Sequence, residues 1–318
     1  MILQLIALTI NCMKNFFDSI LIFGEVLFDV FPDGNRVLGG APFNVACHLK
    51  GFGLDPCFIS RIGNDSPGEE VLGNMKSRSL SLSGLQIDGH RDTGEVRVKI
   101  DNDEPSYEIR QEVAYDYIQM PDSGLINPDR DKLLYHGTLA ARNKVSSSTL
   151  HKLARDKKAR VFCDINLRDP WWTEELVRDI LGWCEYLKVN EDELGRVCSL
   201  EDIDTSGDLK QMAEILRKKR DLKCLIVTLG SKGAMLFPEG RDHLLAPSPK
   251  VQAFQDSVGA GDAFCSVFML GIARGWPWKL ILERAVFFAA RICENQGAVP
   301  EDKNFYDRVI QSWEQENA

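Results

Sequence analysis

The sequence lacks the patterns of several common site types. Its nine cysteines include no C-x-x-C pair, and its five histidines include no H-x-x-x-H spacing. A zinc site built on these residues and a disulfide framework are therefore both disfavoured. We expect free, mostly buried thiols and a reducing, cytoplasmic location.

Positive charge and long hydrophobic runs are also scarce. Lys and Arg number 38 against 47 Asp and Glu, which gives a net charge of −9. General nucleic-acid binders and anionic-membrane binders depend on broad positive surfaces. Residues 1–10 are apolar, but they are too short to span a bilayer and lack a basic start and a cleavage site. We expect neither nucleic acid nor membrane as a partner.

Residues 1–19 precede the first strong strand pattern and are predicted to be an N-terminal extension. Met13 lies within them, and one hypothesis is that the first twelve residues come from an upstream start codon. Mass spectrometry of protein from the native gene would contradict it by finding Met1 or Ile2 at the N-terminus. Residues 20–318 show no repeat or linker and are predicted to form one main domain.

Short apolar runs alternate with helical patterns through the second half of the chain. The runs occupy residues 133–137, 161–165, 186–189 and 225–229. This alternation predicts a mostly parallel sheet wrapped by helices, with a ligand cleft at the carboxyl ends of the strands. Residues 93–118 differ, because apolar and charged residues alternate there around a polar turn, which predicts an antiparallel pair.

Residues 20–31 are predicted to form a buried strand that carries Glu25 and Asp29. Residues four apart point to the same face of a strand. A charged pair on an apolar strand is costly unless it is solvated or hydrogen-bonded. Either this pair lines a cleft that suits a polyol, or the strand ends near Asp29.

Two familiar glycine motifs are missing. No G-x-x-x-x-G-K-[ST] occurs, and Phe264 stands where G-x-G-x-x-G requires its third glycine. A different glycine-rich turn is present at residues 256–264, DSVGAGDAF, and it runs into an apolar helical pattern. The first N–H groups of such a helix are unpaired and form an anion site.

Asp262 has two readings at this turn. It could cap the helix and complement its dipole, a common use of Asp that contributes about 0.5–2 kcal/mol. It could instead accept a proton from a hydroxyl that attacks a bound phosphate. A second glycine block, GGAPFNVA at residues 39–46, places Asn44 in the first turn of another helix. Asn44 can cap locally or offer a donor and an acceptor to a ligand hydroxyl.

The two blocks GGAPFNVA and DSVGAGDAF together resemble the two signatures of the PfkB family of carbohydrate kinases, and the fructokinase branch most of all. The similarity covers most of residues 20–300. It implies a ribokinase-like α/β fold, with three αβα layers, a mostly parallel central sheet and a small β lid contributed mainly by residues 93–118. In the family this lid covers the sugar and often forms a dimer contact, so a homodimer through the lid is an open expectation.

The resemblance also suggests roles for particular residues. It implies Asp262 as general base, with an anion hole at Gly259, Ala260 and Gly261. Candidate sugar-binding residues are Asp29, Gly39, Gly40, Asn44, Arg97, Arg110 and Arg168. Candidate ATP-binding residues are Asn190, Thr228, Gly230, Ser231, Gly233 and Asn295.

Several of these assignments have plain structural alternatives. Arg97 and Arg110 could simply be exposed strand residues, and Arg168, in the D-x-N-x-R pattern at 164–168, could pair with a neighbouring carboxylate. Glu193 completes the family's N-x-x-E, which helps to hold Mg²⁺ through water, yet Asn190 and Glu193 also match a capping box. Asp256 and Ser257 lie where the family can bind a monovalent cation such as K⁺.

We therefore predict ATP-dependent phosphorylation of a sugar primary alcohol, with fructose at its 6-hydroxyl as the first candidate. A 2-keto-3-deoxygluconate kinase shares the D-x-N-x-R pattern and remains an alternative. A non-catalytic sugar or nucleotide sensor on the same fold is a second, although a sensor needs no base at Asp262.

Overall fold

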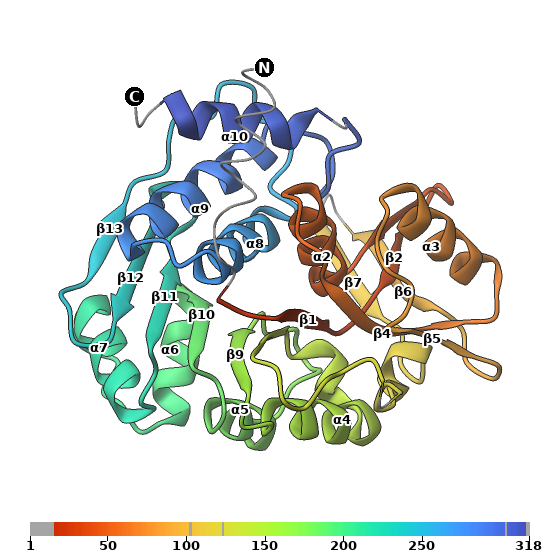
Figure 1. The fold of residues 1–318 in the computed structure, drawn as a ribbon, viewed down its shortest axis with the longest axis horizontal. Helices are drawn as coiled ribbons and strands as arrows, with labels where there is room; N and C mark the ends of the chain where they lie inside the picture. The colour runs from red at the N-terminus through yellow and green to blue at the C-terminus, as the bar shows by residue number, and fades with distance from the viewer. Residues whose placement is uncertain (1–15, 102–103, 123, 303, 316–318) are drawn as a thin grey trace.

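The computed structural model describes residues 16–315 apart from 102–103, 123 and 303. The hypothesis about residues 1–12 lies outside the described residues. The chain forms a central sheet between two layers of helices, with a smaller second sheet at one end (Figure 1). The predicted three-layer α/β fold is thus confirmed.

The central sheet has nine strands. They are β1 (Ser19–Phe23), β4 (Cys57–Gly63), β5 (Leu85–Asp88), β8 (Lys132–His136), β9 (Ala159–Asp164), β10 (Tyr186–Asn190), β11 (Cys224–Thr228), β12 (Ala234–Pro238) and β13 (Leu244–Ala246). Their order is β13-β12-β11-β10-β9-β8-β1-β4-β5. Along this order the neighbouring strands β11, β10, β9, β8, β1, β4 and β5 all pair in parallel. β12 and β13 add an antiparallel edge beside β11.

Helices cover both faces of this sheet (Figure 1). One layer holds α2 (Ala41–Gly51), α3 (Ser66–Ser77), α8 (Ala260–Ala273), α9 (Trp278–Ile292) and α10 (Phe305–Gln315). The other holds α4 (Lys144–Ala154), α5 (Glu174–Leu181), α6 (Glu191–Leu200) and α7 (Leu209–Lys219). Each face has its own hydrophobic core, because side chains alternate along the strands. On β1, Ile20 and Ile22 join the α8 side, whereas Leu21 and Phe23 join the α4 side.

The second sheet has the order β3-β2-β6-β7. Its strands are β2 (Leu27–Val30), β3 (Arg36–Gly39), β6 (Gly94–Asp101) and β7 (Glu104–Ile109). The predicted antiparallel pair within residues 93–118 is found as β6 and β7. After β7 the chain forms a short 3-10 helix, η1 (Ala114–Tyr117). The N-terminal half of the sheet, β2 and β3, was not anticipated.

The prediction of a single strand over residues 20–31 is wrong. The chain leaves the central sheet at Gly24, which has φ 151°, and enters the second sheet at β2. A side chain at Gly24 would lie 2.4 Å from the ring of Pro42, so the turn requires glycine. Glu25 therefore lies in the connection between the sheets, and Asp29 lies on β2.

The parallel strands bring chemistry-bearing residues to one edge of the central sheet. Asp164, Asn190 and Thr228 are the last residues of β9, β10 and β11. In the register, Lys188 pairs with Asp164, and Asn190 pairs with Thr228. This is the edge at which ligands of open α/β sheets bind.

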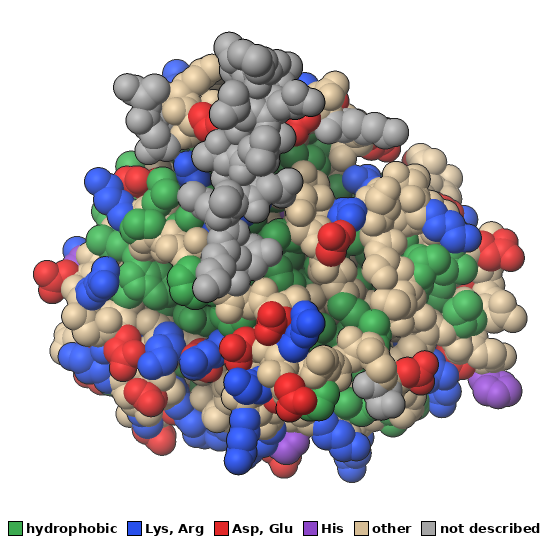
Figure 2. Space-filling model, in the orientation of Figure 1, with side chains coloured by type: hydrophobic (Ala, Val, Ile, Leu, Met, Phe, Trp, Pro, Cys, Tyr) green, Lys and Arg blue, Asp and Glu red, His purple; other side chains and the backbone are tan. Residues whose placement is uncertain are grey.

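The distribution of charged side chains on the surface is consistent with the net negative charge of the chain. On the face in Figure 2, Lys and Arg side chains are interspersed with Asp and Glu and form no continuous basic area. No helix in the described part of the chain is both long and apolar enough to cross a membrane.

Candidate active site

Asp262 lies in the first turn of α8. The residue before this helix, Gly259, has φ 77°, a left-handed conformation that favours glycine. A side chain there would also lie 2.4 Å from the Cβ of Ala298. Glycine at position 259 is thus required both by the backbone conformation and by close packing. At the start of α8, the Ala260 N–H donates to the Ser257 carbonyl at 3.3 Å.

Asn44 on α2 meets Asp262 although the two are 218 residues apart in sequence. The Asn44 side chain is buried, and its Nδ2 donates a hydrogen bond to Asp262 Oδ2 at 2.8 Å. Asn44 makes no cap at the start of α2, where Gly40 is the N-cap. Its Oδ1 is buried and has no partner among the described residues. The two glycine blocks therefore build one site.

The Asp262 carboxyl is suited to accept a proton near neutral pH. Burial raises the pKa of Asp262 from 3.8 to about 7, against the opposing effect of the Asn44 hydrogen bond, and the Asp164 charge adds to the rise. General bases work best when their pKa lies close to the working pH. This favours the base reading of Asp262 over the capping one.

A buried ion pair lies beside Asp262. Lys188 Nζ donates to Asp164 Oδ1 at 2.8 Å, and both side chains are more than nine-tenths buried. The thiol of Cys265 contacts the other Asp164 oxygen at 3.4 Å. Sequence reasoning missed Lys188, and the one signal for it is a lysine inside an apolar strand run, YLKVN.

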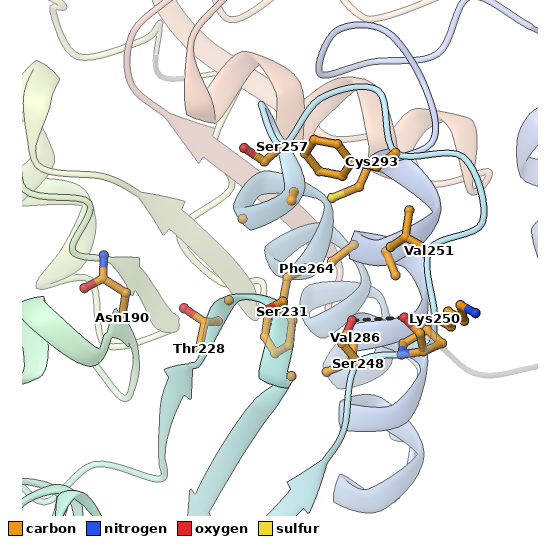
Figure 3. A pocket seen from close by; sticks show the side chains of 18 residues that line it. Asn190, Thr228, Ser231, Ser248, Lys250, Val251, Ser257, Phe264, Val286 and Cys293 are labelled. Atoms are coloured by element: carbon orange, nitrogen blue, oxygen red, sulfur yellow. Dashed lines mark hydrogen bonds between the residues drawn. The ribbon is translucent and has the colours of Figure 1, made fainter. Parts of the chain in front are cut away.

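A cavity of about 650 Å³ opens beside the start of α8 (Figure 3). Of the residues predicted to bind ATP, it is lined by Asn190, Thr228, Gly230, Ser231 and Gly233. Gly230–Lys232 form a 3-10 turn, η3, between β11 and β12. Ala260 and Gly261 line the same cavity, so it reaches the predicted anion hole.

The far wall of the cavity is mostly small or apolar. Figure 3 shows Phe264 on α8, Val286 on α9, Cys293 directly after α9 and Val251 in the segment before α8. Sequence reasoning did not identify these wall residues. A pocket of this size with a few polar groups at one end is typical of a small-molecule site.

Of three further residues predicted for this region, Asp256 and Asn295 do not line the cavity, whereas Ser257 does. Asn295 is not among the residues that line the cavity, and its side chain donates to the Arg291 carbonyl at 2.8 Å. Asp256 accepts from the Val258 N–H at 2.9 Å, while the exposed Ser257 lines the cavity. A cation at Asp256 and Ser257 stays a prediction.

Glu193 makes the capping box that its spacing predicts. Its Oε2 accepts from the Asn190 N–H, and Asn190 Oδ1 accepts from the Glu193 N–H. Its other oxygen, Oε1, accepts from the Leu167 N–H at 2.9 Å. Glu193 therefore ties the D-x-N-x-R loop to the turn after β10. Burial raises its pKa.

Carboxylates gather on the other side of Asp262. Asp29 lies against Gly39, since a Cβ placed on Gly39 would be 3.6 Å from Asp29 Oδ2. A Cβ on Gly40, which has φ 110°, would lie 2.6 Å from the Glu25 carbonyl oxygen. Burial raises the pKa of Glu25 to about 7, and its Oε2 lacks a partner among the described residues.

Arg168 lies within electrostatic reach of this group. Burial raises the pKa of Asp29, and the Arg168 charge opposes that rise at both Asp29 and Glu25. The Arg168 side chain is exposed, and within the described chain its guanidinium makes no hydrogen bond or ion pair. The alternative in which it pairs with Asp164 or Asp169 is not seen.

The two arginines predicted on the second sheet are not brought to Asp262. Arg97 neighbours Val96, which pairs with Asp29, so alternation turns Arg97 to the opposite face, where it pairs with Glu95. Arg110 pairs with Asp92 at 2.7 Å. Any contact of either residue with substrate stays a prediction.

Arg142 is a nearby cation that the sequence did not reveal. It is the last residue of η2 (Leu139–Arg142) and donates to both oxygens of the buried Asp116. Its guanidinium lies over the rings of Tyr115 and Trp171, and its charge opposes the rise in the pKa of Glu25. Nothing in the local sequence pairs Arg142 with Asp116, because they are 26 residues apart.

The site therefore joins a largely apolar cavity to a cluster of carboxylates, with a poised base at the junction. Known proteins are similar in sequence over most of the chain. A fructokinase-2 from Zea mays is 28% identical over 79% of this chain and 79% of its own length. A fructokinase from Klebsiella pneumoniae is 28% identical over 80% of this chain and 84% of its own length.

Solved structures share the fold. Aminoimidazole riboside kinase from Salmonella enterica superposes with a TM-score of 0.77, at 21% identity, over 93% of this chain and 100% of that one. Fructokinase from Vibrio cholerae, solved with fructose, ADP and calcium, superposes with a TM-score of 0.74 at 23% identity, over 89% of this chain and 95% of that one. The family model for the pfkB family carbohydrate kinases matches residues 20–304. The chain therefore belongs to the pfkB family of carbohydrate kinases, enzymes that transfer a phosphoryl group to a sugar hydroxyl.

Proposed function

We propose that this kinase uses ATP to phosphorylate the primary alcohol of a small neutral sugar, with fructose at its 6-hydroxyl as the first candidate. The observation that carries the proposal is the position of Asp262. Its carboxyl accepts a hydrogen bond from Asn44, and it directly follows Ala260 and Gly261, which line the cavity. A base at this junction can reach a hydroxyl that faces the terminal phosphate of a bound nucleotide.

The residues then divide the work as follows. Asp262 accepts the proton of the sugar hydroxyl. The hydroxyl oxygen of the sugar bonds to the γ-phosphorus, and the bond between the γ-phosphorus and the bridging oxygen breaks, which releases ADP. The N–H groups at the start of α8 stabilise the charge on the phosphoryl oxygens, as in other anion holes. The carboxylates of Asp29 and Glu25, with Asn44, hold the sugar hydroxyls. The second sheet covers the sugar and excludes water, which protects ATP from hydrolysis.

The donor set fits a magnesium ion held mainly by nucleotide phosphates and water. No three His, Cys, Asp or Glu side chains form a metal cluster within the described residues. Magnesium commonly uses one or two carboxylates together with substrate phosphates, and it keeps several waters. Glu193, whose oxygens already accept backbone N–H groups, would contact it through water. When bound, the ion supplies positive charge to the phosphates.

The acidic character of the sugar side supports a neutral substrate. Glu25, Asp29 and Asp262 contribute three carboxyl groups to one small region, which disfavours a ligand with its own carboxylate. One observation favours the alternative, a 2-keto-3-deoxygluconate kinase. Arg168 is a guanidinium that makes no hydrogen bond within the described chain, and guanidinium groups are well suited to bind carboxylates.

A substrate panel decides between these candidates. ADP release is measured with Mg²⁺ and ATP across fructose, ketodeoxygluconate, ribose, tagatose and adenosine, with and without potassium. Turnover that is strongest with fructose supports the proposal, and turnover strongest with ketodeoxygluconate replaces the substrate. ATP binding without turnover on any substrate in the panel would contradict the fructose proposal and favour the sensor.

A further inference from the structure

A buried ammonium lies directly behind the glycine turn that opens α8. A methyl group placed on Gly261 would lie 3.5 Å from Lys188 Nζ. Gly261 also lines the cavity proposed for the nucleotide. The cation is therefore separated from the proposed phosphate position by little more than a glycine without a side chain.

The strand fixes where this ammonium points. Tyr186 and Lys188 are two residues apart on β10, so they share a face of the sheet. Tyr186 packs against Phe268 of α8, at a ring-centroid distance of 6.1 Å. Lys188 therefore points into the α8 layer, near the end of the strand at which Asn190 lines the cavity.

Asp164 holds the Lys188 ammonium in place but accepts only part of the hydrogen bonds that the ammonium can donate. Within the described residues, the hydrogen bond of Lys188 Nζ goes to Asp164 Oδ1 at 2.8 Å. An ammonium has three N–H donors. Burial alone would lower the pKa of Lys188, but the charge and hydrogen bond of Asp164 and other negative groups nearby, such as Glu193, together raise it, so the group stays charged.

A second buried lysine, Lys132, has a purely structural setting and can be compared with Lys188. Lys132 Nζ pairs with Asp156 Oδ2 at 2.9 Å, and its side chain is 1% exposed. It also donates to the carbonyls of Pro128 and Arg130. Lys132 begins β8, at the edge of the sheet opposite the site, and its ammonium has several protein partners. Lys188 differs in both respects.

We propose that Lys188 is a further catalytic residue, whose ammonium, held by Asp164, binds the terminal phosphates of the nucleotide beside Gly261 and stabilises the γ-phosphoryl group during transfer. This inference rests on the proposed phosphate site at Gly259–Gly261. Lys188 keeps its proton throughout, because the proton of the sugar hydroxyl passes to Asp262. Its charge offsets the carboxylates of Asp164, Glu193 and Asp262, which would otherwise repel the phosphates.

Nucleotide binding tests the inference independently of the sugar. Calorimetry with the full chain compares the affinities of ATP and AMP, because AMP lacks the β- and γ-phosphates. In Lys188→Met we expect ATP affinity to fall about 10-fold or more while AMP affinity stays unchanged. With the sugar that the panel identifies, kcat should fall about 10²-fold, as for loss of one anion-hole donor. Lys188→Arg, which keeps the charge, should recover part of the ATP preference.

Two variants keep the test decisive. Lys132→Met removes the other buried lysine and should leave the ratio of ATP to AMP affinity unchanged. If Lys188→Met does not fold because Asp164 is left unpaired, the double variant Lys188→Met with Asp164→Asn removes both charges and should show the same selective loss of ATP affinity. An unchanged ATP affinity, or equal losses for ATP and AMP, would overturn the inference. A selective loss of ATP affinity without turnover on any sugar would support Lys188 and count against the proposed function alone.

Discussion

The two halves of the site are built in different ways. The cavity side is lined mostly by glycines, alanines and other apolar residues, with fewer polar ones, such as Asn190, Thr228, Ser248 and Lys250. The proposed sugar side carries Glu25 and Asp29 within electrostatic reach of Arg168. These residues come from the connection between the sheets, the second sheet and the loop after β9, respectively. A cosubstrate common to a family can be bound by shape and backbone groups, whereas the choice of acceptor requires placed charges.

This difference predicts that the halves can be disturbed separately. Changes on the cavity side should act on the nucleotide, changes on the sugar side on the acceptor, and a change at the junction should stop the chemistry. Of the four predictions that follow, three test this separation and one tests the buried state of Glu25; they begin with the largest effect.

Asp262→Asn at the junction should abolish most turnover and leave both binding functions in place. The Asn44 hydrogen bond can be kept, because an amide oxygen still accepts from Asn44 Nδ2. Loss of a general base typically costs about 10²–10⁴ in rate, and we expect kcat to fall about 10³-fold. Steady-state kinetics and calorimetry with ATP measure the two effects.

The pH profile sharpens the same prediction. Because the pKa of Asp262 is about 7 and the ionised form is the active base, wild-type kcat should rise as pH increases through 7. Glu69→Gln, which removes an exposed first-turn carboxylate from α3, serves as the control and should change neither rate nor profile. A near-wild-type rate in Asp262→Asn would show that Asp262 acts as a helix residue.

Asp29→Ala should raise the KM for the sugar about 10- to 100-fold, since hydrogen bonds to charged groups contribute about 1.5–3 kcal/mol. The KM for ATP should stay unchanged. Asp33→Ala is the matched control, because Asp33 lies in the exposed turn between β2 and β3 and caps only Asn35. An equal rise in both KM values would break the separation of the halves.

Glu25 should make the stability of the fold depend on pH. Its pKa is about 7 when folded and near 4.5 when unfolded, so the folded state binds more protons between these values. Its stabilising contribution is complete below pH 4.5 and is lost as pH rises through 7. The loss between pH 5 and 7 should be about 2 kcal/mol.

Denaturant unfolding at pH 5 and pH 7 measures this contribution. Glu25→Gln cannot ionise and should lose less free energy of unfolding than wild type over that range. Glu301→Gln, at an exposed position, should behave as wild type. A Glu25→Gln variant with the wild-type pH dependence would assign the slope to other groups.

Local signals predicted much of this molecule. The turn before α8, the helix that carries Asn44, the strands from β8 to β11 and the capping box at Asn190 each depend on residues close in sequence. The contact of Asn44 with Asp262 could be anticipated only through the family resemblance. The Arg142–Asp116 and Lys188–Asp164 pairs join residues 26 and 24 positions apart, and no local pattern links them.

The strand error has a different cause. Residues 20–31 are apolar enough for one buried strand, and Gly24 alone signals the break. That break depends on the approach of Pro42 to Gly24, a contact between segments that the sequence does not show. The cavity wall was missed at the level of residues because small apolar side chains look the same in a core and in a pocket.

The smallest expected effect tests the cavity side. Ala289 on α9 lines the wall of the cavity, and Ala289→Leu adds three heavy atoms to that space. Filling the wall should raise the KM for ATP about 10-fold by steric exclusion of part of the nucleotide, which corresponds to about 1.4 kcal/mol. The KM for the sugar should not change. Glu283→Leu, at an exposed position of the same helix, is the control and should leave both values unchanged. A rise in the sugar KM alone would place the acceptor in the cavity and reverse the assignment of the two halves.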